Sequence, residues 1–267
     1  NLPYETNDRF LLRHCKTVSP SPTHLAREQY LMKFNKIAIA VGTALLSGSA
    51  LAEFSANVGA TSNYVWRGVT QTDDQAAISG GLDYAHDSGF YAGTWASNVD
   101  FDDDTNAEVD LYAGFGNEFS GIGYDVGVLY YWYPGGDDIN FTDLYGSLSY
   151  GPVTGGINYI VQSQVNKGST SNDTFISGDV YYYISAGFDV APTWSVTGTI
   201  GYFDFKEDGD FDAEAGEDVD TSYAHYQLDI GKSVGEFGDF TFSVSKADDE
   251  SGDDKAKVFV SWSKSFD

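Results

Sequence analysis

The sequence predicts an all-β fold, a transmembrane antiparallel up-and-down β-barrel of about twelve strands. Three observations predict it. Apolar and polar residues alternate with a period of two along most of the chain, the connectors between these segments alternate between short and long, and aromatic residues gather near the ends of the apolar faces. After Ala52 no segment keeps the 3.6-residue period of an amphipathic helix.

The alternating segments come in a regular order, and in each the more apolar face is expected to meet lipid. The first of these faces includes Tyr64 and Trp66, the third Tyr91, Trp95 and Val99, and the eighth begins at Ile176. The twelve predicted strands are 54–66, 76–84, 91–99, 109–115, 122–132, 144–150, 153–161, 176–188, 194–202, 224–230, 240–244 and 258–266.

The connectors between these strands are of two kinds. Those after the even-numbered strands are brief, such as "HDSG", "FSG", "GP" and "APT", whereas those after the odd-numbered strands tend to be longer and acidic, such as "DFDDDTNAE" and "KEDGDFDAEAGEDVD". Short turns at one end and long loops at the other are typical of outer-membrane barrels. A secreted soluble β-sandwich would also alternate, but it has no reason to sort its loops in this way.

The beginning of the chain has the pattern of an export signal. Residues 32–52, "MKFNKIAIAVGTALLSGSALA", contain two lysines, a short apolar run and a small-residue cleavage site. We therefore expect a signal peptide at 32–52, an upstream extension outside the fold at 1–31, and the barrel at 53–267. The only cysteine is Cys15, so the predicted barrel has no disulfide.

The composition excludes one class of partner. The formal net charge is −26, which repels nucleic-acid phosphates and attracts cations. The expected partners are instead outer-membrane lipid and lipopolysaccharide, together with small solutes or cations.

The stretch 62–101 resembles the N-terminal signature of the TorF-like porin family of proteobacteria. The resemblance rests on "NYVWRG", "SGGLDY" and "SGFYAGTWASNVDF". It implies a small outer-membrane barrel over the whole chain after the signal peptide, and it brings no substrate and no catalytic residue. The last segment, "KVFVSWSKSFD", resembles the aromatic-ended closing strand of outer-membrane proteins, except that Asp267 follows the final Phe.

Side chains of the polar parity are the candidate pore lining. Arg67 is expected at the loop-side end of the first strand, facing acidic residues that form one constriction near the loops and a second near the turns. The loop-side set is Asp110, Asp143 and Asp179, and the turn-side set is Asp83, Asp125, Asp189 and Asp229. The inward tyrosines are Tyr112, Tyr131, Tyr145, Tyr181 and Tyr183. The carboxylates either select cations or merely solvate the barrel mouth or pair with tyrosine hydroxyls. The tyrosines either form an aromatic track for a ligand such as a sugar or fill the lumen.

Other kinds of site find little support in the sequence. The acidic segment from Asp208 to Val219 lacks the Gly and Glu that an EF-hand loop requires, because Ala213 and Val219 occupy those positions. Nothing indicates a cofactor, a metal centre or an enzyme, although His225 is an inward histidine in "SYAHYQ" that leaves a hydrolase open. The prediction is a passive pore for small solutes with a preference for cations, and the alternative is a non-conducting barrel whose acidic loops bind cations, lipopolysaccharide or a partner.

Overall fold

The computed structural model describes residues 53–101, 103–165, 174–206, 211–212, 217–218 and 220–267. Every described residue belongs to one compact unit. The predicted upstream extension and signal peptide lie outside the described residues. So does most of the acidic segment from Asp208 to Val219.

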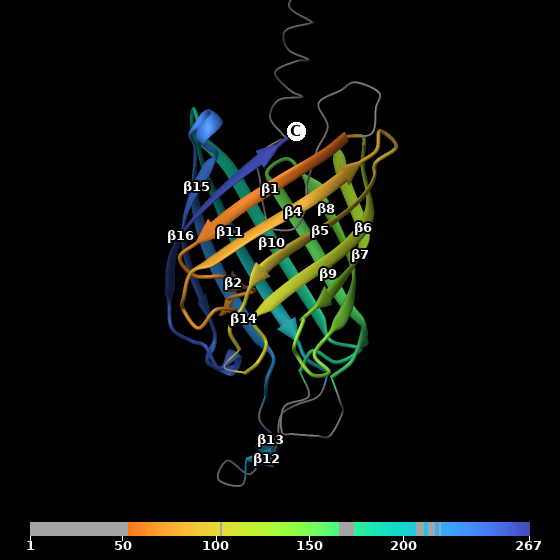
Figure 1. Cartoon of the computed structure of the whole chain (residues 1–267), viewed down its shortest axis with the longest axis vertical. Coiled ribbons are helices and arrows are strands. Elements are labelled where there is room, and N and C mark those ends of the chain that lie inside the picture. Colours follow the sequence, from red (N-terminus) through yellow and green to blue (C-terminus); the bar gives the residue numbers. More distant parts are fainter. Residues whose placement is uncertain (1–52, 102, 166–173, 207–210, 213–216, 219) are drawn as a thin grey trace, which may run out of the picture. The chain divides into compact units, whose positions relative to one another are not determined.

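Twelve strands form a closed barrel, in which each strand pairs antiparallel with its neighbours and β1 closes on β16 (Figure 1). The predicted fold class is therefore confirmed. Strand bounds are β1 Glu53–Thr61, β4 Ala77–Ala85, β5 Phe90–Asn98, β6 Ala107–Phe119, β7 Ile122–Trp132, β8 Phe141–Tyr150, β9 Val153–Ser163, β10 Val180–Ala191, β11 Trp194–Asp204, β14 Tyr223–Ser233, β15 Asp239–Ala247 and β16 Lys257–Phe266.

The remaining elements lie in the connections. They are the strands β2 Val65–Trp66, β3 Val69–Thr70, β12 Phe211–Asp212 and β13 Glu217–Asp218, and the 3-10 helices η1 Gly235–Phe237 and η2 Asp249–Ser251. Among the described residues, no helix has the length and the hydrophobicity needed to cross a bilayer.

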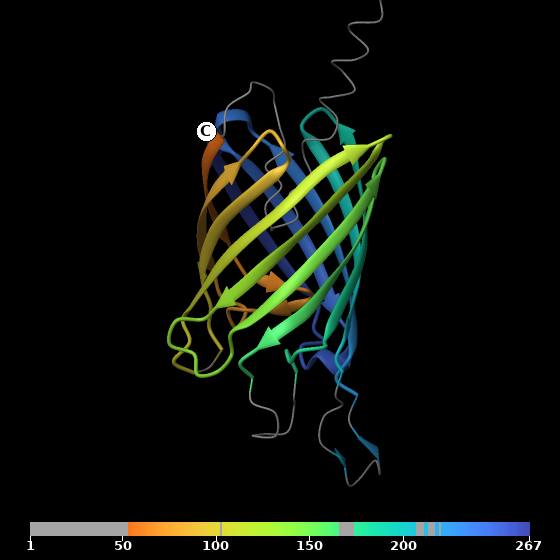
Figure 2. The ribbon, with the colours of Figure 1, turned by 90° about the vertical axis from the view of Figure 1, so that its right-hand side faces the viewer.

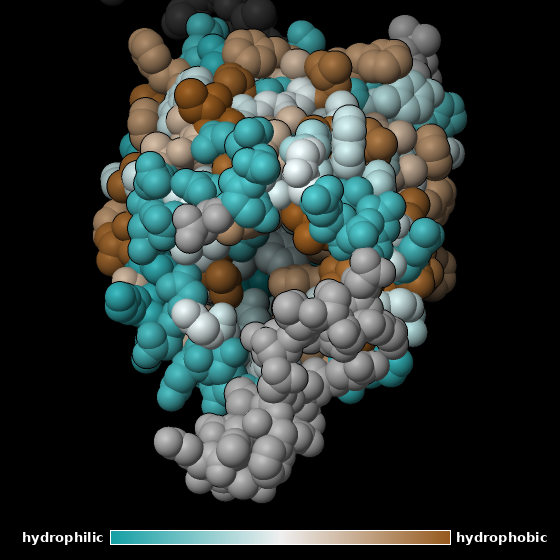
Figure 3. Space-filling model, turned by 60° about the horizontal axis from the view of Figure 1, so that its bottom comes forward, coloured by the Kyte–Doolittle hydropathy of each residue, from teal (hydrophilic) through white to brown (hydrophobic). Residues whose placement is uncertain are grey.

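The two ends of the barrel differ as the connectors predict. At one end, here the turn end, β6 and β7 join through Ser120 and Gly121, whose positive φ angles of 54° and 82° suit a two-residue hairpin turn. The first residue of β1 and the C-terminus also lie there (Figure 1). The longer connections share the opposite end, here the loop end, where Figure 3 shows hydrophilic residues gathered and hydrophobic ones at the flanks.

The outside of the barrel is apolar. Large aliphatic side chains on the outward parity are widely exposed, for example Ile78 at 71%, Leu82 at 62% and Val258 at 62%. In water such a belt would cost free energy in proportion to its area, whereas in hydrocarbon it costs none. Closure also pairs the backbone of every barrel strand with a neighbour, as a bilayer demands.

One of the predicted faces is wrong. In β5, Tyr91, Trp95 and the following Val99 belong to the lumen, because the Tyr91 hydroxyl donates to Asp125 at 2.8 Å and Trp95 stands opposite Asp110 in the register. The reason is that the Tyr91 hydroxyl finds its partner inside and the Trp95 ring packs edge-on against Tyr64, with ring centres 5.6 Å apart. Small residues such as Ala92 and Ala96 face the lipid instead.

The first and eighth strands are shorter than predicted. β1 ends at Thr61, so that Tyr64 and Trp66 are not part of an outer aromatic girdle, and β10 begins only at Val180. Ile176 lies in the connection before β10 and is 1% exposed. Periodicity extends through these boundaries because the connecting segments are folded against the barrel and also bury apolar side chains.

Candidate functional site: a hairpin in the lumen

Residues 62–76 turn inward instead of extending the wall, and we refer to them as the hairpin plug. Val65 and Trp66 pair with Thr70 and Val69 across a two-residue turn. The turn residues Arg67 and Gly68 have φ angles of 47° and 91°, the positive values that such a tight turn requires. β2 lies within the barrel outline in Figures 1 and 2, toward the loop end.

The tip of the plug touches the barrel wall closely. A Cβ atom at Gly68 would lie 2.6 Å from the Cβ of His225 on β14 and 3.1 Å from that of Ala247 on β15. Only glycine fits this approach, since it has no Cβ and tolerates the positive φ.

Arg67 is enclosed by aromatic rings and one carboxylate. Its Nη2 donates to Oδ2 of Asp143 at 3.1 Å, and the two side chains are 7% and 0% exposed. The Arg67 Cζ lies 4.1 Å from the ring centre of Trp66, 4.2 Å from Tyr181 and 5.0 Å from Phe203. We call Asp143, Tyr181, Phe203 and Trp66 the Arg67 cage. Such a cage compensates a buried guanidinium through both charge and ring quadrupoles.

Aromatic packing fills the lumen around the cage. Trp66 meets Tyr131 edge-on with ring centres 5.8 Å apart, and it also packs against Phe175 at 5.9 Å. The walls contribute side chains with almost no solvent exposure, such as Leu129 at 1% and Phe203 at 0%. The loop-end half of the lumen is thus a packed core rather than a water-filled channel.

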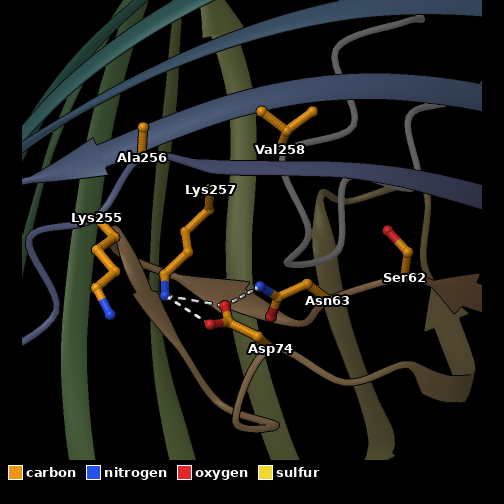
Figure 4. Close-up of a pocket in the computed structure, with 7 residues that line it drawn as sticks. All are labelled: Ser62, Asn63, Asp74, Lys255, Ala256, Lys257 and Val258. Atoms are coloured by element: carbon orange, nitrogen blue, oxygen red, sulfur yellow. Dashed lines mark hydrogen bonds and ion pairs between the residues drawn. The ribbon is translucent and has the colours of Figure 1, made fainter.

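Ionic contacts fasten the base of the plug to the strand β16 (Figure 4). Lys257 Nζ lies 2.9 Å from Oδ1 of Asp74, and Asn63 donates to Asp74 at 2.7 Å. Lys257 Nζ also lies 2.6 Å from Oδ1 of Asp253. The hydrogen bond from Lys257 is the main reason that the pKa of Asp74 is lowered. These groups border a shallow pocket of about 270 Å³ at the loop end.

Two acidic residues of β6, Glu108 and Asp110, lie beside the plug. The Tyr64 hydroxyl donates to Glu108 at 2.9 Å, and burial followed by the charge of Glu108 raises the pKa of Tyr64, so that this hydroxyl stays protonated. Asp110, two residues further along β6, is 7% exposed, and its Oδ1 has no hydrogen-bond partner among the described residues.

The turn-end half of the lumen is more open. Asp83, Asp125 and Asp229 face it and are only half-buried. Asp83 accepts from Tyr112 and Asn57, Asp125 accepts from Tyr91, and Asp229 accepts from Ser243 at 2.6 Å. We call this half the vestibule.

Small wall residues make room for the vestibule, and aromatic side chains lie directly over some of them. A Cβ at Gly93 would come within 2.6 Å of Cζ of Tyr112, so the ring of Tyr112 covers that glycine on the neighbouring strand. This cross-strand contact fixes the ring where its hydroxyl can reach Asp83.

The predicted lining residues have different environments. Arg67 lies at the plug tip rather than at a strand end, and of the three loop-side carboxylates it pairs with Asp143. Asp179 accepts backbone N–H groups of Ile176 and Lys206, which orders the connections, and Asp189 is exposed at a β-bulge of the turn end. The inward tyrosines Tyr112, Tyr131 and Tyr181 are buried, and Tyr145 and Tyr183 are half-buried.

Alternation in the sequence does not identify every residue of the site. Trp66, Phe203, Glu108 and Lys257 belong to the plug and its surroundings, and His225, expected inward, accepts or donates a 2.8 Å hydrogen bond with the Tyr181 hydroxyl. The sequence "VWRGV" carries the signal that could have indicated the hairpin, because a glycine follows one residue in the centre of a short β-prone run. No group of three or more His, Cys, Asp or Glu in the described part of the chain could hold a metal ion.

The fold and the site define a class, the closed antiparallel β-barrel with an apolar outside and an occluded lumen. A family model described as "Bacterial protein of unknown function (Gcw_chp)" matches residues 47–266. The chain belongs to the Gcw_chp family. No curated protein matches it.

Solved structures resemble this chain at low sequence identity. A KdgM porin structure has a TM-score of 0.50 at 8% identity, covering 78% of this chain and 98% of that chain. A structure of KdgM porin in complex with disordered oligogalacturonate has a TM-score of 0.49 at 6% identity, covering 79% of this chain and 98% of that chain. The structure of Acinetobacter baumannii OccAB1 has a TM-score of 0.40 at 12% identity, covering 74% of this chain and 60% of that chain. The first of these likenesses establishes a porin-like barrel fold and nothing of the solute.

Proposed function

We propose that the protein is an outer-membrane porin, exported with residues 32–52 as a cleaved signal peptide, that passes small solutes by passive diffusion with a preference for cations. The hairpin plug closes its lumen, and solutes pass when the plug leaves the aromatic core. The observation that carries this proposal is the buried Arg67–Asp143 ion pair at the tip of the plug.

The ion pair supports a plug that moves, because it joins two charged groups inside a core that apolar side chains would fill more simply. Replacing a buried pair by well-packed apolar residues is often neutral or stabilising, so a buried pair is weak support for a purely structural role. When the plug leaves, by contrast, water or a small ion can replace the partner of each charged group.

The preference for cations rests on the vestibule. Asp83, Asp125 and Asp229 line it without a lysine or arginine paired to any of them among the ion pairs of the described residues. A ring of carboxylates in a narrow, low-dielectric passage concentrates cations and repels anions. The resemblance of "NYVWRG" and "SGGLDY" to TorF-like porins agrees with this proposal.

The alternative is a non-conducting barrel whose acidic loops bind cations, lipopolysaccharide or a partner. The observation that favours it is the packing of the loop-end half, where Leu129, Phe203 and Asp143 are each no more than 1% exposed. A barrel filled in this way could be a surface scaffold with no passage at all.

Single-channel recording in planar bilayers separates the two functions. We would refold residues 53–267, a variant with 63–75 replaced by a short Gly–Ser linker, and a control with the loop 134–139 replaced in the same way. The proposal expects rare conductance steps in the unmodified barrel, frequent larger steps without the plug, and a reversal potential that indicates cation preference. Silence in all three supports the non-conducting barrel, and an anion-selective reversal potential contradicts the cation preference.

A further inference from the structure

We propose that the Arg67 cage is a binding site for a free organic cation of the guanidinium type, which Arg67 occupies as an internal ligand while the lumen is closed. The inference rests on the proposed function in one respect: such a cation is then the class of solute that displaces the plug and passes.

The cage has the chemistry that recognises a planar cation. Tyr181 and Trp66 each lie about 4 Å from the guanidinium carbon, Phe203 lies at 5.0 Å, and Asp143 provides the counter-charge. A guanidinium combines weak hydration, flat faces for stacking and N–H groups in one plane, so it gains from rings and a carboxylate together. A compact ammonium ion gains less, because it keeps more of its hydration.

Arg67 uses the cage incompletely. Only its Nη2 reaches Asp143, while its Nη1 is buried without a hydrogen-bond partner among the described residues, and so is Oδ1 of Asp143. Each such unpaired buried group costs free energy. The two-residue turn holds the Arg67 backbone at a φ of 47° and ties the side chain to one approach. A free guanidinium can rotate to form two parallel hydrogen bonds with the carboxylate, which is the stronger arrangement.

The wall half of the cage is held in place without the plug. Asn158 on β9 donates to Oδ2 of Asp143 at 3.2 Å, and the ring of His225 on β14 stacks on Tyr181 and shares a hydrogen bond with its hydroxyl. Asp143, Tyr181 and Phe203 come from three barrel strands, β8, β10 and β11. These groups therefore remain arranged for a cation when Arg67 withdraws.

A route to the cage leads from the vestibule. Tyr183 lies one step nearer the turn end on β10, is half-buried, and stacks on Tyr181 with ring centres 5.9 Å apart. Asp125 lies in the vestibule and carries no paired cation in the described structure. A cation attracted by the vestibule carboxylates would thus meet successive aromatic faces on the way to Asp143.

The direct test removes the internal ligand and offers a free one. We would titrate the refolded Arg67→Ala barrel in detergent with methylguanidine and with methylammonium, and follow tryptophan fluorescence and the thermal unfolding midpoint. The inference expects saturable methylguanidine binding that raises the midpoint and is about tenfold tighter than methylammonium binding, equivalent to one additional charge-assisted hydrogen bond. Lys246→Ala, which removes an exposed outward cation, should leave this response unchanged in the same background.

Asp143 provides the control within the cage. Adding Asp143→Asn to Arg67→Ala should weaken methylguanidine binding about tenfold or more, because the bidentate acceptor is lost. Equal affinities for the two cations, or methylguanidine binding that ignores Asp143→Asn, would overturn the inference.

If Arg67→Ala does not refold, the same two cations are added to the wild-type barrel to test the site. Methylguanidine at millimolar concentration should raise the frequency of conductance steps or, in a silent barrel, change the tryptophan signal saturably, and methylammonium should do neither. Binding without current supports the site and contradicts the proposed function. Current without any specific effect of methylguanidine supports the proposed function and contradicts the site.

Discussion

Gly68→Ala perturbs the hairpin plug at the point where the wall leaves no space for a side chain. The added methyl group would meet Cβ of His225 at 2.6 Å and Cβ of Ala247 at 3.1 Å, and the residue would keep a φ of 91°. The positive φ costs an alanine about 1–2 kcal/mol. Overpacking against two wall side chains adds about 1–3 kcal/mol. The plug can relieve the overpacking by leaving the lumen.

Gly252→Ala is the matched control, because Gly252 has a φ of 70° and no atom within 4 Å of an added Cβ. It carries the backbone cost alone, and so the two variants differ by the overpacking. A difference of about 1–3 kcal/mol shifts the equilibrium between closed and open barrels by roughly 5- to 150-fold. The assay is the open probability in single-channel recordings of the refolded barrels. Equal open probabilities for Gly68→Ala and Gly252→Ala would refute the close seating of the plug on the wall.

Three further predictions concern the Lys257–Asp74 ion pair, the vestibule and the outer face. Lys257→Met should raise the open probability at neutral pH, because it removes the ion pair with Asp74. Since the pKa of Asp74 is lowered, the wild-type ion pair should be complete above the ordinary aspartate pKa of about 4 and should be lost only as the pH falls below it. An unchanged open probability in Lys257→Met would contradict this role of the ion pair. Gly93→Ala should displace Tyr112 from Asp83 and lower the free energy of unfolding by about 1–3 kcal/mol, whereas Gly198→Ala, with open space around it, should be nearly neutral in urea titrations. Ile200 faces outward and is 52% exposed, so Ile200→Arg should lower the free energy of unfolding in lipid by about 2–4 kcal/mol and reduce the amount of heat-modifiable folded barrel on gels. Thr199→Arg, on the lumen side of the same strand, should not. Similar yields of folded barrel for both variants would argue against lipid contact.

The sequence predicts the barrel well because its strongest signals are local. A period of two, two-residue turns such as Ser120–Gly121 and the sorting of loop lengths each follow from a few neighbouring residues. They establish the number of strands, and in most strands they also establish which face meets lipid. In β5 the prediction of the lipid-facing side fails, because hydrophobicity alone does not reveal that the Tyr91 hydroxyl donates a hydrogen bond to Asp125.

The plug was missed because its determinants are spread over the whole chain. Arg67 meets Asp143 from 76 positions away, and Lys257 meets Asp74 across 183 positions. No periodicity in 54–66 distinguishes a strand that continues from one that turns into the lumen, since Trp66 is apolar in either setting. Alternation puts Asp143 on the inward parity, but it does not show which of the loop-side carboxylates Arg67 meets.

Thiol labelling tests the occluded lumen most directly, because the barrel contains no cysteine and Cys15 precedes it. Thr197→Cys would place a thiol on the half-buried lumen face of β11 near the turn end, and Ser245→Cys would place one on β15 at a position that is 0% exposed. With a charged, water-soluble maleimide, we predict rapid labelling of Thr197→Cys, slow labelling of Ser245→Cys, and faster labelling of Ser245→Cys once Gly68→Ala displaces the plug. Equally rapid labelling of both thiols in the otherwise unmodified barrel would contradict the closed loop-end half and the plug that closes it.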